Sequence, residues 1–195
     1  KKNIAYDKNC TYLLFVGRIV KDKGITELVN CFNRLLQKNP SLRLVLVGQF
    51  EKQLDPLAPA TEKEITHNNS IIHIYWSGRV EYYMALADYF VFPSYREGFP
   101  NVLLEAGAMK LPIICSNIGG NIDIVTHQDT GLIYDTYNEA DMQEKMEWAL
   151  NHKDEMAKMS EKLYEKVTTE YKRETFWAQM NQQYKKLIKE NNILK

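Results

Sequence analysis

Short runs of apolar residues alternate along the chain with longer segments in which apolar residues recur every three or four positions. The short runs predict six buried strands, at residues 11–17, 42–48, 71–78, 88–94, 111–116 and 130–135. Because these runs are apolar almost throughout, they are typical of a parallel sheet covered on both faces.

The segments between the runs have helical spacing. Helices are predicted from Ile25 until Asn39-Pro40 ends the first one, near 61–67, at 80–87, at 101–109, and after a glycine-rich turn at 116–121. Strands that alternate with helices predict an α/β fold, a Rossmann-like, doubly wound parallel sheet of six strands.

Beyond residue 135 the pattern is helical to the end of the chain. Thr136 and Glu139 form a candidate capping box before the first of three helices. The second and third are marked by two series of apolar residues, Met156, Met159, Leu163 and Val167, then Phe176, Met180, Tyr184 and Leu187. We therefore expect a single domain over 1–195, with a core at 11–150 and a helical extension at 151–195. An apolar face made by Phe176, Trp177 and Met180 packs on this domain or covers a partner.

Composition limits the function classes. Of the 195 residues, 45% are hydrophobic and 26% are charged, which suffices for a packed core. The 25 lysines and arginines equal the 25 aspartates and glutamates, which argues against a general nucleic-acid binder. No apolar run approaches the roughly 18 residues of a membrane span. Three scattered cysteines and four histidines indicate neither a disulfide framework nor a metal site. A cytoplasmic location is the default expectation.

The loops that follow the strands are the candidate ligand sites, because ligands bind beyond the carboxyl ends of parallel strands. The loop at 17–24 places Arg18 and Lys23 near the start of a helix, which suits a phosphorylated group. The alternative is a solvated, charged loop. The glycine spacing of the loop at 17–24 is not that of a P-loop or of a dinucleotide-binding fingerprint.

The segment at 94–108 combines an expected helix start with two carboxylates. Pro100 is expected in the first helical turn, which leaves the amides from Gly98 to Val102 to face an anion. Glu97 and Glu105 would accept hydrogen bonds from hydroxyl groups, so the segment is typical of a nucleotide-sugar site. Alternatively, Glu105 complements the helix dipole and Glu97 is a loop charge. The turn at 116–121 is a second place where backbone approaches a ligand, or a plain tight turn.

These motifs together resemble the C-terminal domain of a family 4 retaining glycosyltransferase of the two-Rossmann-domain (GT-B) fold. Glu97 and Glu105 have the spacing of the E-x7-E signature of that family. The other matching motifs, in the order of the family, are G-R-x5-G at 17–24, S-G-R-V at 77–80, A-D-Y-F-V-F-P-S at 87–94, L-P-I-I-C-S at 111–116, I-G-G at 118–120 and T-G-L-I-Y at 130–134. Residues 48–57 also resemble sugar transferases of bacterial capsule, lipopolysaccharide or glycan assembly.

The resemblance implies roles for individual residues. Arg18 and Lys23 would bind the donor diphosphate, Glu97 would contact the donor sugar, and Glu105 would hold the ribose. The implied catalytic set is Glu97, Arg18 and Lys23, and the implied donor-binding set is Gly17, Arg79, Val80, Gly98, Phe99, Pro100, Asn101, Val102, Leu103 and Glu105. The resemblance further implies transfer of a hexosyl group from a nucleotide sugar, with a UDP-sugar preferred to a GDP-sugar. The transfer would retain the anomeric configuration and would need no metal or cofactor.

Two positions depart from the family pattern. Lys110 stands where members commonly have glycine, so we expect it to adopt a positive φ or the turn to differ. Phe50 replaces a glycine, which puts donor contacts from that loop in doubt.

The resemblance also implies a preceding acceptor-binding domain, which this sequence lacks, so the chain is expected to be the donor-binding half. For the full-length protein, the expected partner is a glycan or lipid-linked acceptor. Peripheral attachment at the inner face of the membrane is also expected. Two alternatives stay open, a noncatalytic nucleotide-sugar-binding domain and a nucleotide-sugar epimerase of the same fold.

Overall fold

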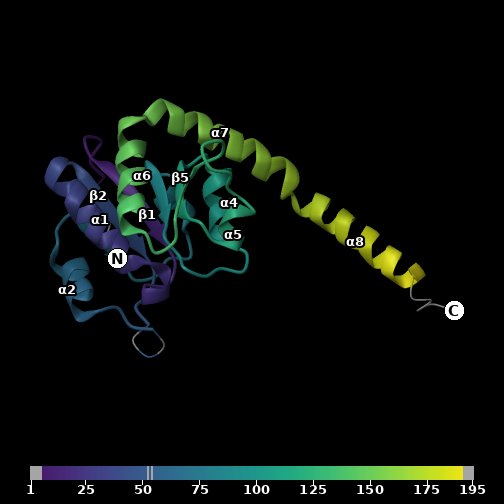
Figure 1. The fold of residues 1–195 in the computed structure, drawn as a ribbon, viewed down its shortest axis with the longest axis horizontal. Helices are drawn as coiled ribbons and strands as arrows, with labels where there is room; N and C mark the ends of the chain where they lie inside the picture. Colours follow the sequence, from purple (N-terminus) through teal and green to yellow (C-terminus); the bar gives the residue numbers. More distant parts are fainter. Residues whose placement is uncertain (1–5, 52, 54, 191–195) are drawn as a thin grey trace.

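The computed structural model describes residues 6–51, 53 and 55–190, apart from the side chains of 173–176, 178 and 179. Six strands form one parallel sheet, which confirms the predicted fold class (Figure 1). They are β1 (Thr11–Val16), β2 (Leu42–Val47), β3 (Ile71–Ile74), β4 (Tyr89–Phe92), β5 (Ile113–Ser116) and β6 (Leu132–Tyr134). Their order in the sheet is β3-β2-β1-β4-β5-β6, the order of a doubly wound fold.

The point where the chain order reverses lies between β1 and β4. β1 pairs with β2 along its whole length, from Thr11 opposite Leu42 onward. On its other side it pairs with β4 through a short ladder, Leu13 opposite Tyr89 and Leu14 opposite Phe90. The loops that leave β1 and β4 therefore begin side by side at the carboxyl edge of the sheet, where such folds bind ligands.

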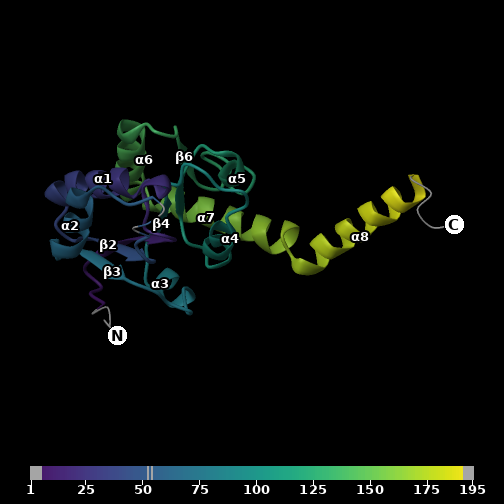
Figure 2. The ribbon, with the colours of Figure 1, turned by 90° about the horizontal axis from the view of Figure 1, so that it is seen from below.

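Helices cover both faces of the sheet. They are α1 (Ile25–Lys38), α2 (Pro59–His67), α3 (Glu81–Met84), α4 (Asn101–Ala108), α5 (Gly119–Ile122), α6 (Glu139–Asn151), α7 (Lys153–Glu170) and α8 (Arg173–Glu190), with a 3-10 turn at Lys21–Lys23. α1 packs against α2 and α6, and α4 packs against α7. Figure 2 shows α1 and α6 on one side of the sheet and α3 and α4 on the other.

The core lies on both faces because the strands are apolar in consecutive positions. Leu14, Phe15 and Phe90 are fully buried in the sheet, and Leu28 and Phe32 on the inner face of α1 are fully buried against it. Each such side chain contributes about 1.5–3 kcal/mol through burial. This rigid layer fixes the starting points of the loops that carry the charged residues.

Several predicted strands are shorter than expected. The strand predicted at 71–78 ends at Ile74, and Tyr75 and Trp76 are 63% and 68% exposed. The strand predicted at 88–94 ends at Phe92, because the next residue, Pro93, has no N–H for the ladder. The runs extend further because the residues beyond the strands are still apolar, and a run of apolar residues does not mark where pairing stops.

The predicted capping box is wrong. The side chain of Asn138, rather than Thr136, caps α6 by accepting a hydrogen bond from the N–H of Asp141 at 3.0 Å. The Thr136 hydroxyl instead donates to the carbonyl of Asn117 at 2.7 Å. Tyr137 has a positive φ of 66°, which turns the chain before the helix begins at Glu139. The expectation for Lys110 is confirmed, because its φ is 56°.

The helical extension has two parts. α7 packs against α4, whereas α8 extends away from the sheet (Figures 1 and 2). The predicted apolar face on α8 is described only in part, because the side chain of Phe176 lies outside the described residues; Trp177 is about half exposed. Among the helices the structure describes, none has both the length and the apolar character that crossing a membrane requires.

Candidate functional site

The loops after β1 and β4 are in direct contact, and Gly24 permits this contact. Gly24 has a φ of 64°, in the left-handed region that favours glycine. A Cβ at this position would lie 2.2 Å from the carbonyl oxygen of Pro93 at the end of β4. The close approach brings Lys23, the residue before Gly24, next to the loop that contains Glu97.

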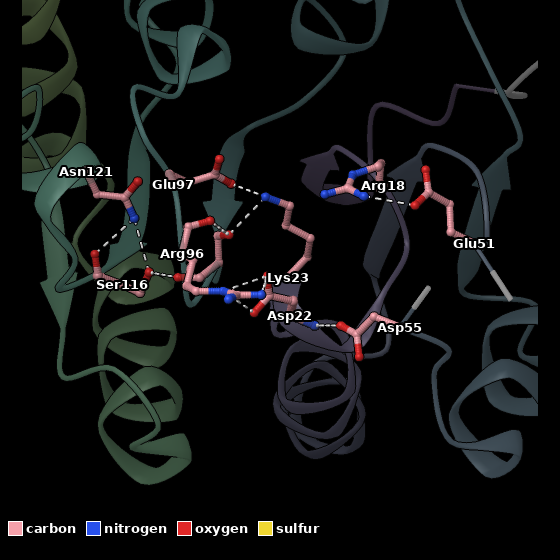
Figure 3. A network of polar contacts seen from close by, with 10 residues as sticks. Arg18, Asp22, Lys23, Glu51, Asp55, Arg96, Glu97, Ser116 and Asn121 are labelled. Atoms are coloured by element: carbon pink, nitrogen blue, oxygen red, sulfur yellow. Dashed lines mark hydrogen bonds and ion pairs between the residues drawn. The ribbon is translucent and has the colours of Figure 1, made fainter. Parts of the chain in front are cut away.

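Lys23 connects the two loops. Its ammonium forms an ion pair with the carboxylate of Glu97 and donates to the hydroxyl oxygen of Ser94 at 3.3 Å. Lys23 is only 8% exposed, so its charge depends on these partners for stabilisation. The sequence placed Lys23 and Glu97 in one site, and the structure brings them together (Figure 3).

Exposed ion pairs surround this buried one. Arg18 pairs with Glu51 in the loop after β2, with a distance of 2.8 Å between Nη1 and Oε2. The guanidinium of Arg96 binds the carboxylate of Asp22 at 3.0–3.2 Å. The N–H of Asp22 donates to a carboxylate oxygen of Asp55 at 2.6 Å. The loops after β1, β2 and β4 are thus tied to one another (Figure 3).

A hollow of about 430 Å³ opens between these loops. Its lining residues are Arg18, Asp22, Lys23, Tyr95, Arg96, Glu97, Gly98, Ile118 and Gly119. The lining carries three cations and two carboxylates, and the third carboxylate, Glu51, pairs with Arg18 just outside the lining. The hollow therefore suits an anionic ligand that replaces a carboxylate at an exposed cation such as Arg18 and offers hydroxyl groups to the carboxylates.

α4 begins at the edge of this hollow. Pro100 is the N-cap residue with extended backbone, and the helix starts at Asn101, so the prediction of Pro100 inside the first turn is wrong by one residue. Gly98 and Phe99 are exposed in the loop before it. Leu103 is a larger correction: its side chain is fully buried and its N–H donates to the carbonyl of Pro100. We assign Leu103 to the core rather than to ligand binding.

The start of α5 closes the other side of the hollow. A Cβ at Gly120 would lie 2.7 Å from the carbonyl oxygen of Gly98 and 3.2 Å from that of Glu97. The glycine-rich turn is therefore packed against the β4–α4 loop, and Ile118 and Gly119 line the hollow.

Glu105 lines a second, more apolar hollow of about 390 Å³ between α3 and α4. The other lining residues are Gly78, Val80, Glu81, Met84, Ala108 and Met109. Partial desolvation, and secondarily the charge of Glu81, raises the pKa of Glu105. Arg79 does not line this hollow with its side chain, which pairs with Glu81 and lies 4.4 Å from the ring centre of Tyr82. Of the predicted pair Arg79 and Val80, only Val80 lines it.

A third hollow of about 240 Å³ neighbours the first two. It is lined by Val16, Gly17, Arg18, Val47, Gly48, Gln49, Glu51, Trp76, Ser77 and Val80. It shares Arg18 with the first hollow and Val80 with the second. Lys23, Arg18 and Glu105 therefore line neighbouring hollows along the carboxyl edge of the sheet. Phe50, the second departure from the family pattern, lies edge-on to His73 with ring centres 4.7 Å apart and does not line any of the three.

The polar residues next to Lys23 are not predictable from the sequence. Ser94, Ser116 and Asn121 are fully buried, and each takes part in hydrogen bonds near the site. Serine and asparagine at the ends of apolar runs are too common to single out. Only their burial identifies them.

A larger hollow, of about 670 Å³, lies at the outer edge of β6 and contains none of the predicted residues. Asn117, His127, Asp135 and Asp141 are among its lining residues. The Asp141 carboxylate is already engaged by the N–H of Asp135 at 2.7 Å and by Lys145 at 3.0 Å. Size alone therefore does not select it. Within the described part of the chain, no group of three or more His, Cys, Asp or Glu side chains is arranged to hold a metal ion.

A parallel sheet of this order, with charged residues in the loops at the switch point, is the architecture of a Rossmann-like domain such as those that make up a GT-B protein. Residues 1–166 match the family described as "Glycosyl transferases group 1", and the chain belongs to this family.

Curated relatives include CapM of Staphylococcus aureus, a capsular polysaccharide biosynthesis glycosyltransferase. It is 30% identical over 178 residues, which cover 91% of this chain and 46% of the relative. The putative teichuronic acid biosynthesis glycosyltransferase TuaC of Bacillus subtilis is 31% identical over 120 residues, or 62% of this chain and 28% of the relative. The chain thus spans less than half the length of these two relatives.

Solved structures have the same fold. The C-terminal domain of the group 1 glycosyltransferase LpcC of Francisella tularensis has a TM-score of 0.75 at 24% identity, over 86% of this chain and 90% of that domain. Anabaena HepE, in complex with UDP and glucose, has a TM-score of 0.81 at 18% identity, over 91% of this chain and 49% of HepE.

Proposed function

We propose that this chain is the donor-binding part of a retaining glycosyltransferase that moves a hexosyl group from a nucleotide sugar to a glycan or lipid-linked acceptor. One observation carries the proposal. Lys23 is held between Ser94 and Glu97 at the switch point, and a third hollow that lies between shares one lining residue with the hollow of Lys23 and one with the hollow of Glu105.

Each group in these hollows has a chemical task. Lys23 and Arg18 bind the diphosphate and counter the negative charge that develops on it as the leaving group departs. The first amides of α4 add the partial positive charge of a helix start. Glu105 accepts hydrogen bonds from the ribose, and Glu97 contacts the donor sugar near its reacting carbon. These cations take the place of a metal, so the reaction needs none.

We propose UDP as the nucleotide of the donor, in preference to GDP. The structure of HepE in complex with UDP-glucose, which has the same fold, supports this choice. CapM and TuaC, whose names refer to capsular polysaccharide and teichuronic acid, support an acceptor in bacterial surface-polymer assembly. An acceptor-binding domain before this one and a cytoplasmic location at the inner face of the membrane belong to the same proposal.

Calorimetric titration of the chain with UDP and GDP tests the proposal. UDP is expected to bind more tightly than GDP, and Lys23→Ala is expected to weaken UDP binding more than tenfold, because it removes a cation that contacts the diphosphate. Lys38→Ala is the matched control: Lys38 also forms an ion pair, with Glu147 at 2.7 Å, but on α1 and away from the hollows. This control should leave the affinity unchanged.

The same titration tests whether nucleotide binding is independent of a metal ion, and an assay of the full-length protein tests the alternative functions. EDTA or added Mg²⁺ should change UDP affinity less than twofold. Failure of both nucleotides to bind at millimolar concentration would contradict the proposal. For the full-length protein, transfer of the sugar to an acceptor is expected; isomerisation of the donor without an acceptor would indicate an epimerase, and binding without transfer across an acceptor panel a noncatalytic domain.

A further inference from the structure

A chain of buried polar groups lies directly behind Lys23. It consists of Ser94 two residues beyond β4, Ser116 at the end of β5 and Asn121 in α5, all three fully buried. In Figure 3 the dashed contacts run from Asn121 through Ser116 toward the site, and from there to Lys23 and Glu97. This series of hydrogen bonds therefore connects the loops after β4 and β5 to Lys23 in the loop after β1.

The direction of the hydrogen bonds fixes how Ser94 faces Lys23. The Ser94 hydroxyl donates to the carbonyl of Arg96 at 3.1 Å. With its hydrogen so engaged, its oxygen is left to accept from the Lys23 ammonium at 3.3 Å. Of the three N–H donors of a lysine, one then faces Ser94 and one faces Glu97. The third remains for an oxygen of a ligand in the hollow that Lys23 lines.

Ser116 and Asn121 in turn fix Ser94. The Ser116 hydroxyl donates to the carbonyl of Ser94. The Asn121 amide nitrogen donates to the Ser116 hydroxyl oxygen at 3.1 Å and to the Ser116 carbonyl at 3.0 Å. Each group thus orients the next one, and the last member holds the ammonium of Lys23.

These hydrogen bonds also satisfy the backbone. Those from Ser116 and Asn121 reach the carbonyls of Ser94 and Ser116, two buried residues. The side-chain oxygen of Asn121 is buried and has no hydrogen-bond partner among the described residues. The network therefore fixes the backbone just beyond β4 and at the end of β5, and the Ser94 hydroxyl faces Lys23 from this fixed backbone.

We infer that Ser94 is a positioning residue for Lys23, and that Ser116 and Asn121 hold Ser94 in the required orientation. The inference rests on the proposed function, in which Lys23 binds the diphosphate. A lysine side chain is long and flexible, so a fixed acceptor that restrains its ammonium lowers the entropy lost when a phosphate binds. Ser94 itself need not touch the ligand.

The test compares UDP with uridine, which lacks the phosphates. Ser94→Ala is expected to lower UDP affinity five- to tenfold and to leave uridine affinity unchanged, as followed by NMR titration of the tryptophan indoles. The matched control is Ser160→Ala in α7. Ser160 is 4% exposed and also donates to a carbonyl, that of Ala157 at 2.8 Å, but it lies outside the three hollows. This control should change neither affinity.

A double-mutant cycle shows whether Ser94 acts through Lys23. If it does, adding Ser94→Ala to Lys23→Ala should weaken UDP binding no further than Lys23→Ala alone. Ser116→Ala keeps the Ser94 hydroxyl but releases its carbonyl, so a two- to threefold loss for UDP alone is expected; this variant makes the same test if Ser94→Ala does not fold.

Three results would overturn the inference: unchanged UDP affinity in Ser94→Ala, equal losses for UDP and uridine, or additive effects in the cycle. The proposed function fails separately, when the unmodified chain binds neither UDP nor GDP.

Discussion

At the scale of single residues, the way each charge is paired decides what its removal does. Lys23 and Glu97 form a mostly buried pair, so the loss of one partner leaves the other without compensation and affects both stability and binding. Arg18 pairs with Glu51 at the surface, where such a pair contributes at most about 1 kcal/mol. Substitution of Arg18 should therefore report on ligand binding with little effect on the fold.

The raised pKa of Glu105 makes stability depend on pH in a defined direction. Because the pKa is higher in the folded than in the unfolded chain, the folded state holds its proton to a higher pH. The contribution of Glu105 to the free energy of unfolding therefore falls as the pH rises from about 4.3, the ordinary pKa of glutamate, through the raised pKa. Glu105→Gln removes this pH-dependent decrease in the free energy of unfolding, because glutamine does not ionise. In urea unfolding between pH 4 and 7.5, the stability of Glu105→Gln relative to the unmodified chain should increase as the pH rises.

The same variant checks the ribose role. Protonation of Glu105 removes a charged acceptor, so the UDP affinity of the unmodified chain should decline toward that of Glu105→Gln as the pH is lowered through the raised pKa. Comparing the two proteins at each pH cancels the ionisation of UDP itself. A constant ratio of affinities across this range would exclude a pH-dependent contact from Glu105.

At the scale of elements, the site depends on how closely the loops approach one another. Gly24 permits the β1–α1 loop to touch Pro93, and Gly120 permits α5 to touch the loop before α4. Both contacts are between backbone atoms, so a side chain at either position must displace a whole loop. The spacing of these loops thus depends on the absence of a Cβ at Gly24 and at Gly120.

Gly24→Ala tests this dependence. The left-handed φ and the 2.2 Å approach to the Pro93 oxygen should together lower the free energy of unfolding by about 2–3 kcal/mol. UDP affinity should fall as well, because Lys23 moves with the loop. Gly98→Ala is the control for stability, since a Cβ there has nothing within 4 Å, and its effect should stay within about 0.5 kcal/mol. Thermal and urea unfolding measure both.

Strands and helices could be predicted where they depend on the pattern of neighbouring residues in the sequence. The apolar runs and the helical spacing after Ile25 predicted the strands, the first helix and their alternation, and the loops at 17–24 and 97–105 followed from the alternation. Helix and strand ends were less predictable: Asn138 rather than Thr136 caps α6, because the strained turn at Tyr137 moves the start of the helix. The partners of Lys23 could be only half predicted, since Glu97 belongs to a motif whereas Ser94 is identified by a contact 71 positions away.

At the scale of the whole molecule, the α/β body and α8 differ in how much packing they share. α7 covers α4, where Leu163 and Val167 lie 3.0 Å from where a Cβ on Gly107 would be. α8 extends away from this body (Figure 1). The lining residues of the three neighbouring hollows all lie between residues 16 and 119.

A chain that ends after residue 172 should therefore keep its fold and its ligand. We expect the free energy of unfolding to change by less than about 1 kcal/mol and UDP affinity by less than twofold. A chain that ends after residue 152 is the control: it also loses α7, exposes the apolar side of α4, and should unfold or aggregate. Circular dichroism and calorimetry measure both. A large loss of stability in the first truncation would show that α8 packs on the body.

The short ladder between β1 and β4 has a consequence for the action of a substrate. It joins two three-stranded halves of the sheet. The ion pairs Lys23–Glu97 and Asp22–Arg96 connect the loops that leave these two halves. A diphosphate compound that contacts both loops would itself become a cross-link between the halves. Donor binding would then slow hydrogen exchange at the Asp88 amide, which donates across the boundary to the carbonyl of Tyr12 at 2.9 Å. A ligand bound at the edge of the sheet would in this way stabilise the pairing of its two halves.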